Sequence, residues 1–207
     1  MKTRGSVFIV LLILCAGLLA FINPAPPEEL SINSAIPMPG YKMKDITGKK
    51  VSLNDIKKEK GLLVIFSCNT CPYVRLTEER IKEYTDLCLD NNIGSVLVNS
   101  NEAQRSEDDS FEAMVKYYNA QKLRCCYTVD EKSQLANAFG AGRTPQCFLF
   151  DSKGQLIYKG AIDDNVKDAA AVKAPYLKDA ITALLNNETP KTQETKSIGC
   201  TIKRAES

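Results

Sequence analysis

The chain has 207 residues, of which 44% are hydrophobic and 25% are charged, so it contains enough apolar material for one well-packed globular domain. Its 27 basic residues nearly balance its 25 acidic residues, and no basic stripe is present, so nucleic acid is not expected as a partner. The complete absence of histidine excludes Cys–His activation of a nucleophile and most mixed Cys/His metal sites.

The N-terminus has the charge and hydropathy pattern of an export signal. Lys2 and Arg4 precede an apolar run at residues 7–22, and a Pro-rich stretch follows. We therefore predict a signal peptide or membrane anchor at residues 1–24 and a Pro-rich linker at residues 25–35. The run is somewhat shorter than the roughly 20 residues that span a bilayer, so cleavage and retention both stay open. Either form exports the domain, which would be periplasmic or anchored to the membrane on its non-cytoplasmic side.

The following segment alternates between short apolar strands and amphipathic helices, which favours an α/β domain. Its expected elements are, in chain order, a hairpin (41–53), a strand (62–66), a helix (72–88), a strand (95–98), a helix (110–121), a strand (125–129), a helix (131–139), a hairpin (146–158) and a closing helix (173–185). A βαβ half is thus followed by a ββα half, and together they form one domain at residues 36–189.

Residues 190–207 form a polar tail without apolar periodicity, which we interpret as a loosely held extension. The tail contains Cys200. Because an extended chain spans about 3.3 Å per residue, the tail is long enough to bring Cys200 to a distant site in the domain. Cys200 is therefore a candidate auxiliary redox residue.

The main candidate site is the Cys-x-x-Cys pair formed by Cys68 and Cys71. It follows a buried strand and, with Pro72 in the first helical turn, opens a helix. The free N–H groups and partial positive charge of a helix N-terminus stabilise a thiolate, so we expect a depressed pKa at Cys68. In the predicted exchange Cys68 attacks and Cys71 resolves. An isolated pair would equally fit a static disulfide or half of a metal site, but the strand-to-helix context favours redox chemistry.

A second candidate element is Thr144-Pro145, which lies between a Gly-rich helix end and a strand. A cis bond at this position would expose backbone to an extended peptide beside the cysteine pair; the alternative is an ordinary trans turn. Arg143 is a candidate stabiliser of the Cys68 thiolate, with a solvated surface arginine as the alternative.

Several segments together resemble one known family. They are residues 66–74 (FSCNTCPYV), 130–134, 144–145, 148–151, 158–160, 163–165 and 199–203. They are similar to the peroxiredoxin-like branch of the alkyl hydroperoxide reductase and thiol-specific antioxidant (redoxin) family, over roughly residues 36–204. The resemblance implies a thioredoxin-like three-layer α/β/α domain with a central mixed sheet and an N-terminal β-hairpin.

The resemblance also implies roles for individual residues. Cys68 and Cys71 would be the redox pair and Pro145 the cis-proline next to Thr144, while Cys200 would match a terminal cysteine that relatives also carry. No cofactor is implied. The expected partners are protein or small-molecule disulfides and thiols, together with an external electron donor.

One departure from the family weakens a peroxidase interpretation. A peroxidatic cysteine is normally preceded by Thr three residues back and Pro seven residues back, but Cys68 has Ile65 and Gly61 there. Without that hydroxyl, nothing obvious stabilises the charge that develops on the leaving oxygen of peroxide. We therefore predict an exported thiol–disulfide oxidoreductase, with a thiol-dependent peroxidase acting on peroxide as the alternative.

The other cysteines favour a structural role. A copper or zinc carrier is a further alternative, because Cys125 and Cys126 add soft ligands. However, neighbouring strand residues point to opposite faces of a sheet, and the histidine used by similar copper chaperones is missing. Cys88 and Cys147 fit the apolar face of a helix and a strand, so we expect both to be buried and unreactive. No metal site is predicted.

Overall fold

The structure is a computed structural model that describes residues 28–205. The predicted signal peptide or anchor at residues 1–24 lies outside the described residues. Within 28–205, no helix is both long enough and apolar enough to cross a membrane.

A mixed seven-stranded sheet forms the centre of the domain, in the order β2-β1-β5-β4-β3-β7-β8. β3, β4 and β5 are parallel, whereas the outer strands pair antiparallel. A separate two-stranded sheet joins β6 to β9. The strands are β1 (Met43–Asp45), β2 (Lys50–Val51), β3 (Gly61–Ser67), β4 (Ile93–Asn99), β5 (Cys126–Val129), β6 (Arg143–Thr144), β7 (Gln146–Phe150), β8 (Leu156–Gly160) and β9 (Cys200–Thr201).

Helices cover both faces of the sheet, which gives the three-layer arrangement of the thioredoxin-like fold. The α-helices are α1 (Leu53–Ile56), α2 (Pro72–Asp90), α3 (Phe111–Gln121), α4 (Gln134–Phe139) and α5 (Tyr176–Leu185), and the 3-10 turns are η1 (Glu102–Gln104), η2 (Glu131–Ser133) and η3 (Ala169–Ala171). The predicted α/β class and mixed sheet are confirmed.

β3 shows why the core has two halves. Its side chains alternate between the faces of the sheet. Leu63 and Ile65 pack with residues of α2, α3 and α5, whereas Leu62, Val64 and Phe66 pack with residues of α1 and α4. All seven β3 residues are buried, as expected for a central strand covered on both sides. The strand therefore holds whatever follows Ser67 in a fixed place.

The N-terminal hairpin is shorter than the sequence pattern indicates. β1 pairs antiparallel with β2, which ends at Val51. Ser52 caps α1 through a capping box with Asp55, so Leu53 begins a helix instead of extending the strand. The capping signal is stronger than the β-propensity of this segment.

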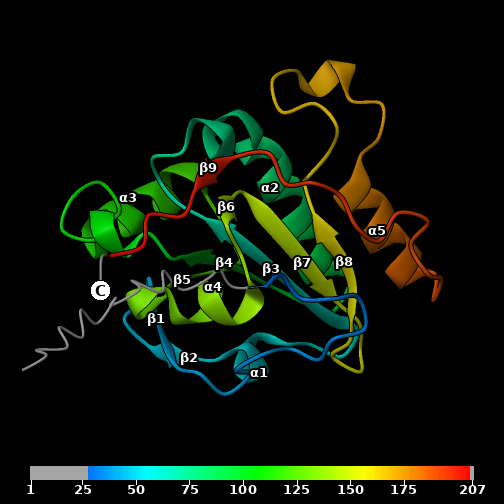
Figure 1. The fold of residues 1–207 in the computed structure, drawn as a ribbon, viewed down its shortest axis with the longest axis horizontal. Helices are drawn as coiled ribbons and strands as arrows, with labels where there is room; N and C mark the ends of the chain where they lie inside the picture. The colour runs from blue at the N-terminus through cyan, green and yellow to red at the C-terminus, as the bar shows by residue number, and fades with distance from the viewer. Residues whose placement is uncertain (1–27, 206–207) are drawn as a thin grey trace, which may run out of the picture.

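The C-terminal segment is not the loosely held extension expected from its polar sequence. It pairs with the domain through β9, and Ile202 is buried. Figure 1 shows this segment, in red, running from α5 leftwards across the upper half of the view, through β9 to the C-terminal end. Its packing relies on main-chain hydrogen bonds such as Thr195 N–H to Lys159 O, which leave no hydropathy pattern in the sequence.

Residues 28–35, in the predicted linker, also lie against the domain. Leu30 N–H donates to Phe139 O, and Glu29 accepts a hydrogen bond from the side chain of Gln146. The packed part of the chain therefore begins before residue 36, where sequence analysis placed the domain boundary.

Candidate active site

The Cys68–Cys71 segment joins the end of β3 to the start of α2. Cys71 is the N-cap residue of α2 and has an extended backbone (φ −68°, ψ 121°), and Pro72 begins the helix. This placement follows from local sequence, because Pro is favoured in the first turn of a helix, where its missing N–H is not needed. Both thiols are almost inaccessible: Cys68 is 1% exposed and Cys71 is 2% exposed.

Thr144 lies directly against both sulfur atoms. Cys71 Sγ donates a hydrogen bond to the main-chain oxygen of Thr144, at 3.0 Å. Cys68 Sγ lies 3.6 Å from Thr144 Oγ1 and 4.0 Å from Thr70 Oγ1. The Thr144-Pro145 peptide bond is cis. The structure thus brings together two segments that are far apart in the chain. They contain four residues that were predicted from the sequence: Cys68, Cys71, Thr144 and Pro145.

The two thiols differ in how easily each one ionises. A hydrogen bond with Cys68 lowers the pKa of Cys71. Burial partly offsets this decrease, and the Cys200 side chain lowers the pKa further. Conversely, the hydrogen bond with Cys71, burial and the charge of Asp109 all raise the pKa of Cys68. The depressed pKa expected at Cys68 is therefore found at Cys71, because a thiolate at Cys71 and the Asp109 carboxylate oppose negative charge at Cys68.

Asp109 is a buried acid beneath the cysteine loop, and its role was not predicted from the sequence. Its carboxylate accepts hydrogen bonds from Asn69 N–H at 2.8 Å, Thr70 Oγ1 at 3.3 Å, Asn99 Nδ2 at 2.9 Å and Asn101 Nδ2 at 2.8 Å. These bonds hold the two residues between the cysteines in place. The only local signal was a run of polar residues before α3, which is typical of an ordinary helix start.

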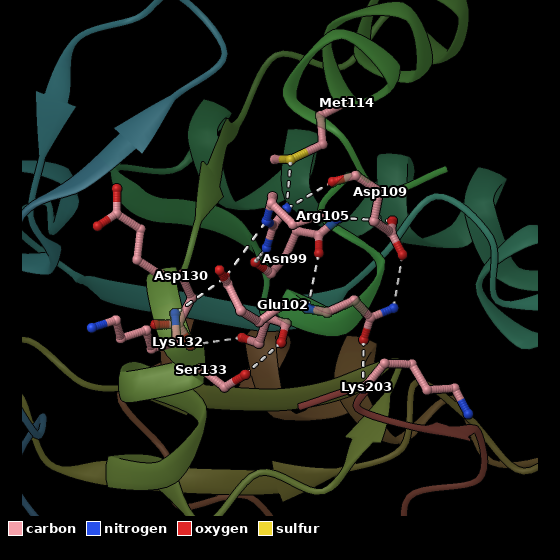
Figure 2. A network of polar contacts seen from close by, with 12 residues as sticks. Asn99, Glu102, Arg105, Asp109, Met114, Asp130, Lys132, Ser133 and Lys203 are labelled. Carbon is pink, nitrogen blue, oxygen red and sulfur yellow. Dashed lines mark hydrogen bonds and ion pairs between the residues drawn. The ribbon is translucent and has the colours of Figure 1, made fainter. Parts of the chain in front are cut away.

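A wider polar network supports Asp109 (Figure 2). Arg105 donates to the main-chain oxygens of Asp109 and Asn99, and so ties the α3 start to the end of β4. Asp130 accepts from Ser100 Oγ at 2.8 Å and from two N–H groups at the start of α4. Burial raises the pKa of Asp130. The loops at the carboxyl ends of β4 and β5 are thus joined into one hydrogen-bonded platform.

Arg143 does not point to the cysteine pair. Its Nη1 donates to Gly199 O and to Thr201 Oγ1, both at 3.3 Å. Arg143 therefore holds the C-terminal segment, and its placement does not support the expected role as stabiliser of the Cys68 thiolate. Cys200, on the same segment, is opposite Thr144 in the β6–β9 pairing.

The remaining described cysteines lie away from this site. Cys88 and Cys147 are fully buried in the core, which confirms the predicted burial, and burial raises the pKa of both thiols. Cys125 and Cys126 belong to opposite faces of the sheet. Burial also raises the pKa of Cys125, to about 12, and that of Cys126. In the described part of the chain all cysteines are free thiols, and no cluster of three or more acidic or cysteine ligands could hold a metal ion.

A surface groove lies beside the loop between the two cysteines. Asn69 and Thr70 form one side of it, and Lys116 and Tyr117 of α3 form another, with Arg75 also lining it. Thr70, which lines this groove, has its Oγ1 4.0 Å from Cys68 Sγ. The groove gives a substrate a place to bind near the sulfurs.

Comparison with known proteins identifies the same family. A family model described as Redoxin matches residues 33–173. An uncharacterized conserved protein from Geobacillus kaustophilus is 27% identical, with a TM-score of 0.79 over 86% of this chain and 94% of that chain. A hypothetical protein from Sinorhizobium meliloti is 28% identical, with a TM-score of 0.79 over 87% and 98% of the two chains.

A more distant structure shares the fold. A secreted disulfide oxidoreductase from Mycobacterium tuberculosis, described as homologous to E. coli DsbE, is 10% identical, with a TM-score of 0.51 over 71% of this chain and 95% of that chain. No match was found among curated proteins. The family match supports a general thiol-dependent redox function.

Proposed function

The chain belongs to the redoxin family of the thioredoxin-like superfamily, and on that basis we propose that it is a thiol–disulfide oxidoreductase that works through Cys68 and Cys71. One observation carries the proposal. Both thiols meet at the N-terminus of α2 and are in contact with the same residue, Thr144, which precedes a cis-proline. A helix N-terminus stabilises a thiolate, which a static structural role would not need.

The proposed cycle uses the pair as a two-electron carrier. One thiolate attacks a substrate disulfide and forms a mixed disulfide, and the other thiol displaces the reduced substrate and closes the Cys68–Cys71 disulfide. An external dithiol donor then returns the pair to its reduced form. The same groups would oxidise substrate thiols if the donor were replaced by an oxidant.

The order of attack follows from the acidity of the two thiols. The sequence-based order begins with Cys68, but the hydrogen bonds of the pair favour ionisation of Cys71. We therefore assign the first attack to Cys71 and the resolving step to Cys68, which lies beside the Thr70 hydroxyl.

A thiol-dependent peroxidase is the second candidate, and one observation favours it. Thr144 Oγ1 and Thr70 Oγ1 both flank Cys68 Sγ. These hydroxyls would partly replace the missing threonine three residues before Cys68 in polarising a bound peroxide. The raised pKa of Cys68 opposes this function, because only the thiolate attacks peroxide efficiently.

We propose that the enzyme works outside the cytoplasm. The basic and apolar N-terminal pattern of residues 2–22 supports export, and the secreted disulfide oxidoreductase named above shares the fold. Fractionation of cells that express the full chain, with protease protection of its domain, tests this location. Recovery of the domain in the cytoplasm would contradict it.

The activity test compares disulfide reduction with peroxide consumption in one assay. Purified protein with a dithiol donor is given either insulin or hydrogen peroxide, for the wild type and for Cys68→Ser and Cys71→Ser. We expect insulin reduction by the wild type, its loss in both variants, and peroxide consumption no faster than that of free thiol. Fast peroxide turnover that depends on Cys68 would favour the peroxidase instead.

A matched control separates loss of chemistry from loss of a cysteine in general. Cys126→Ser removes a half-buried thiol on β5, away from the pair. This variant is expected to reduce insulin at the wild-type rate. If it lost activity as completely as Cys68→Ser, the assignment of the pair would fail.

A further inference from the structure

Cys200 lies where an extended substrate would be expected to bind. β9 pairs antiparallel with β6, with Cys200 opposite Thr144. The main-chain oxygen of Thr144 is also the acceptor of the Cys71 hydrogen bond. Strand addition beside such a residue is a common way to bind an extended peptide. The chain therefore fills its own strand-binding edge with a segment that contains a cysteine.

The contact between the segment and the active site is close. A Cβ at Gly199 would lie 2.1 Å from Thr144 O and 3.2 Å from Pro145 N, so only glycine allows this approach. Cys200 is opposite Thr144, whose main-chain oxygen accepts the hydrogen bond from Cys71 Sγ, and the Cys200 and Cys71 side chains influence each other's pKa. Cys68, Cys71 and Cys200 are thus all next to one residue, Thr144.

The segment is anchored on both sides of β9, and before β9 Thr195 N–H donates to Lys159 O. Beyond β9, Ile202 is buried and its N–H donates to Gly142 O at 3.1 Å. Lys203 N–H donates to Asn101 Oδ1 at 2.9 Å, and Ala103 N–H donates to Lys203 O at 2.9 Å, next to the platform around Asp109 (Figure 2). These contacts keep Cys200 at Cys71 instead of leaving it on a free tail.

Accessibility differs between the three thiols. Cys68 and Cys71 are almost fully buried, whereas Cys200 is partly exposed. An external thiol must reach a sulfur atom in line with the disulfide bond to attack it. Once the Cys68–Cys71 disulfide has formed beneath the C-terminal segment, a donor outside the protein meets Cys200 before it meets either member of the pair.

We propose that Cys200 is a third redox thiol, which exchanges with the Cys68–Cys71 disulfide and presents the oxidised state of the enzyme to its donor. The proposal rests on the disulfide exchange proposed above. Cys200 thiolate attacks Cys71 Sγ, so the Cys71–Cys200 bond forms, the Cys68–Cys71 bond breaks, and Cys68 leaves as a thiolate that takes up a proton. This step is an exchange, so no electron enters or leaves the protein.

The donor completes the cycle at Cys200. A thiolate of an external dithiol attacks Cys200 Sγ, a mixed disulfide forms there, and Cys71 leaves as its thiolate. The second thiol of the donor then attacks the donor sulfur that is bonded to Cys200. The donor disulfide closes, and Cys200 leaves as a thiolate. The donor is thereby oxidised to a disulfide, and the protein gains the two electrons that the substrate had withdrawn.

The test maps disulfides in the full-length protein after oxidation by insulin. Samples are quenched with acid and alkylating agent at intervals and digested with trypsin without reduction. Cleavage after Lys60 and Arg75 leaves Cys68 and Cys71 on one peptide, residues 61–75, and cleavage after Lys196 and Lys203 leaves Cys200 on residues 197–203. A link between these two peptides reports the proposed exchange.

We expect the disulfide within residues 61–75 to form first and the link to residues 197–203 to follow. The link should be absent in Cys71→Ser and in Cys200→Ser, whereas Cys200→Ser should still form the disulfide within residues 61–75. Burial and the Cys71 thiol raise the pKa of Cys200 to about 11. The second step should therefore accelerate about tenfold per pH unit up to that value, because the thiolate is the nucleophile.

The failure of this proposal is distinct from the failure of the proposed function. If oxidised wild-type protein holds only the disulfide within residues 61–75 at every time and pH, or if Cys200→Ser matches the wild type when donor concentration limits turnover, the role of Cys200 is refuted and the pair remains. If residues 61–75 form no disulfide and insulin is not reduced, both proposals are refuted.

A variant that keeps every cysteine provides an independent arm. Gly199→Ala should displace β9 from Thr144, slow formation of the Cys71–Cys200 link at least about tenfold, and speed alkylation of reduced Cys71 by a similar factor, each corresponding to about 1.4 kcal/mol. Gly40→Ala is the matched control, since nothing lies within 4 Å of its added Cβ. A wild-type rate of link formation in Gly199→Ala would contradict the proposed geometry.

Discussion

The Cys71 thiol donates a hydrogen bond of 3.0 Å to the main-chain oxygen of Thr144, 73 residues away in sequence. This contact joins the helix that carries the cysteine pair to the cis-proline segment. Thr144 is also opposite Cys200 in β9, so one residue contacts both the redox pair and the strand next to it.

The acidity of the pair predicts which thiol reacts first. Reduced protein treated briefly with iodoacetamide at neutral pH should be labelled mainly at Cys71, because its pKa is lowered and that of Cys68 is raised. As the pH falls, labelling at Cys71 should persist well below the pH at which an ordinary thiol stops reacting, and should decline only near its lowered pKa. Fragment spectra of residues 61–75 locate the label. Predominant labelling at Cys68 would contradict the assignment.

Removal of the buried carboxylate should change the balance between the two thiols. Asp109→Asn removes a negative charge that raises the pKa of Cys68, so labelling at Cys68 should increase. The variant also leaves buried donors without an acceptor, so the free energy of unfolding should fall by about 1–3 kcal/mol. Asp108→Asn is the control, because that neighbouring side chain is exposed. Equal effects of the two variants would show that Asp109 has no specific influence.

The hydroxyl of Thr144 should matter to Cys68 in particular. Thr144→Val keeps the shape of the side chain and the main-chain acceptor of Cys71, but it removes the hydroxyl 3.6 Å from Cys68 Sγ. That hydroxyl lowers the pKa of Cys68, so its loss should raise this pKa further and slow insulin reduction by up to about tenfold, as for one hydrogen bond. Thr144→Ser should restore the rate. If Ser failed to do so, the effect would belong to packing.

The ion pair between Arg80 and Asp163 predicts a large loss of stability without direct involvement in catalysis. The two side chains are 9% and 0% exposed, and Arg80 also donates to main-chain oxygens of Asn165 and Val166. Arg80→Met should lower the free energy of unfolding in urea by about 3–5 kcal/mol, because it leaves a buried carboxylate without its partner.

Two further variants make that stability measurement specific. Arg80→Met combined with Asp163→Leu should recover much of the loss, since the uncompensated charge is gone. Lys178→Met breaks the exposed pair with Glu83 and should cost about 0–1 kcal/mol. Equal losses for Arg80→Met and Lys178→Met would contradict the importance of burial.

Much of the fold could be predicted because its signals are local. The apolar run of β3 and the proline after Cys71 act within a few residues, so strand, loop and helix follow directly from sequence. The same logic located Thr144-Pro145. The strand β2 was predicted two residues too long. The alternation of polar and apolar residues does not reveal that Ser52 caps the helix α1.

The partners of the cysteine pair depended on the tertiary structure. Asp109 acts on Cys68 only because the order of the strands brings the end of β4 next to that of β3, and a polar residue before a helix carries no sign of this. Cys200 lies at Thr144 because β9 is held by main-chain hydrogen bonds, which any sequence can form. Sequence alone determined where the two thiols lie, through propensity and hydrophobic period. Only the packed structure decided which thiol ionises first and what covers it, because charge and burial act through space.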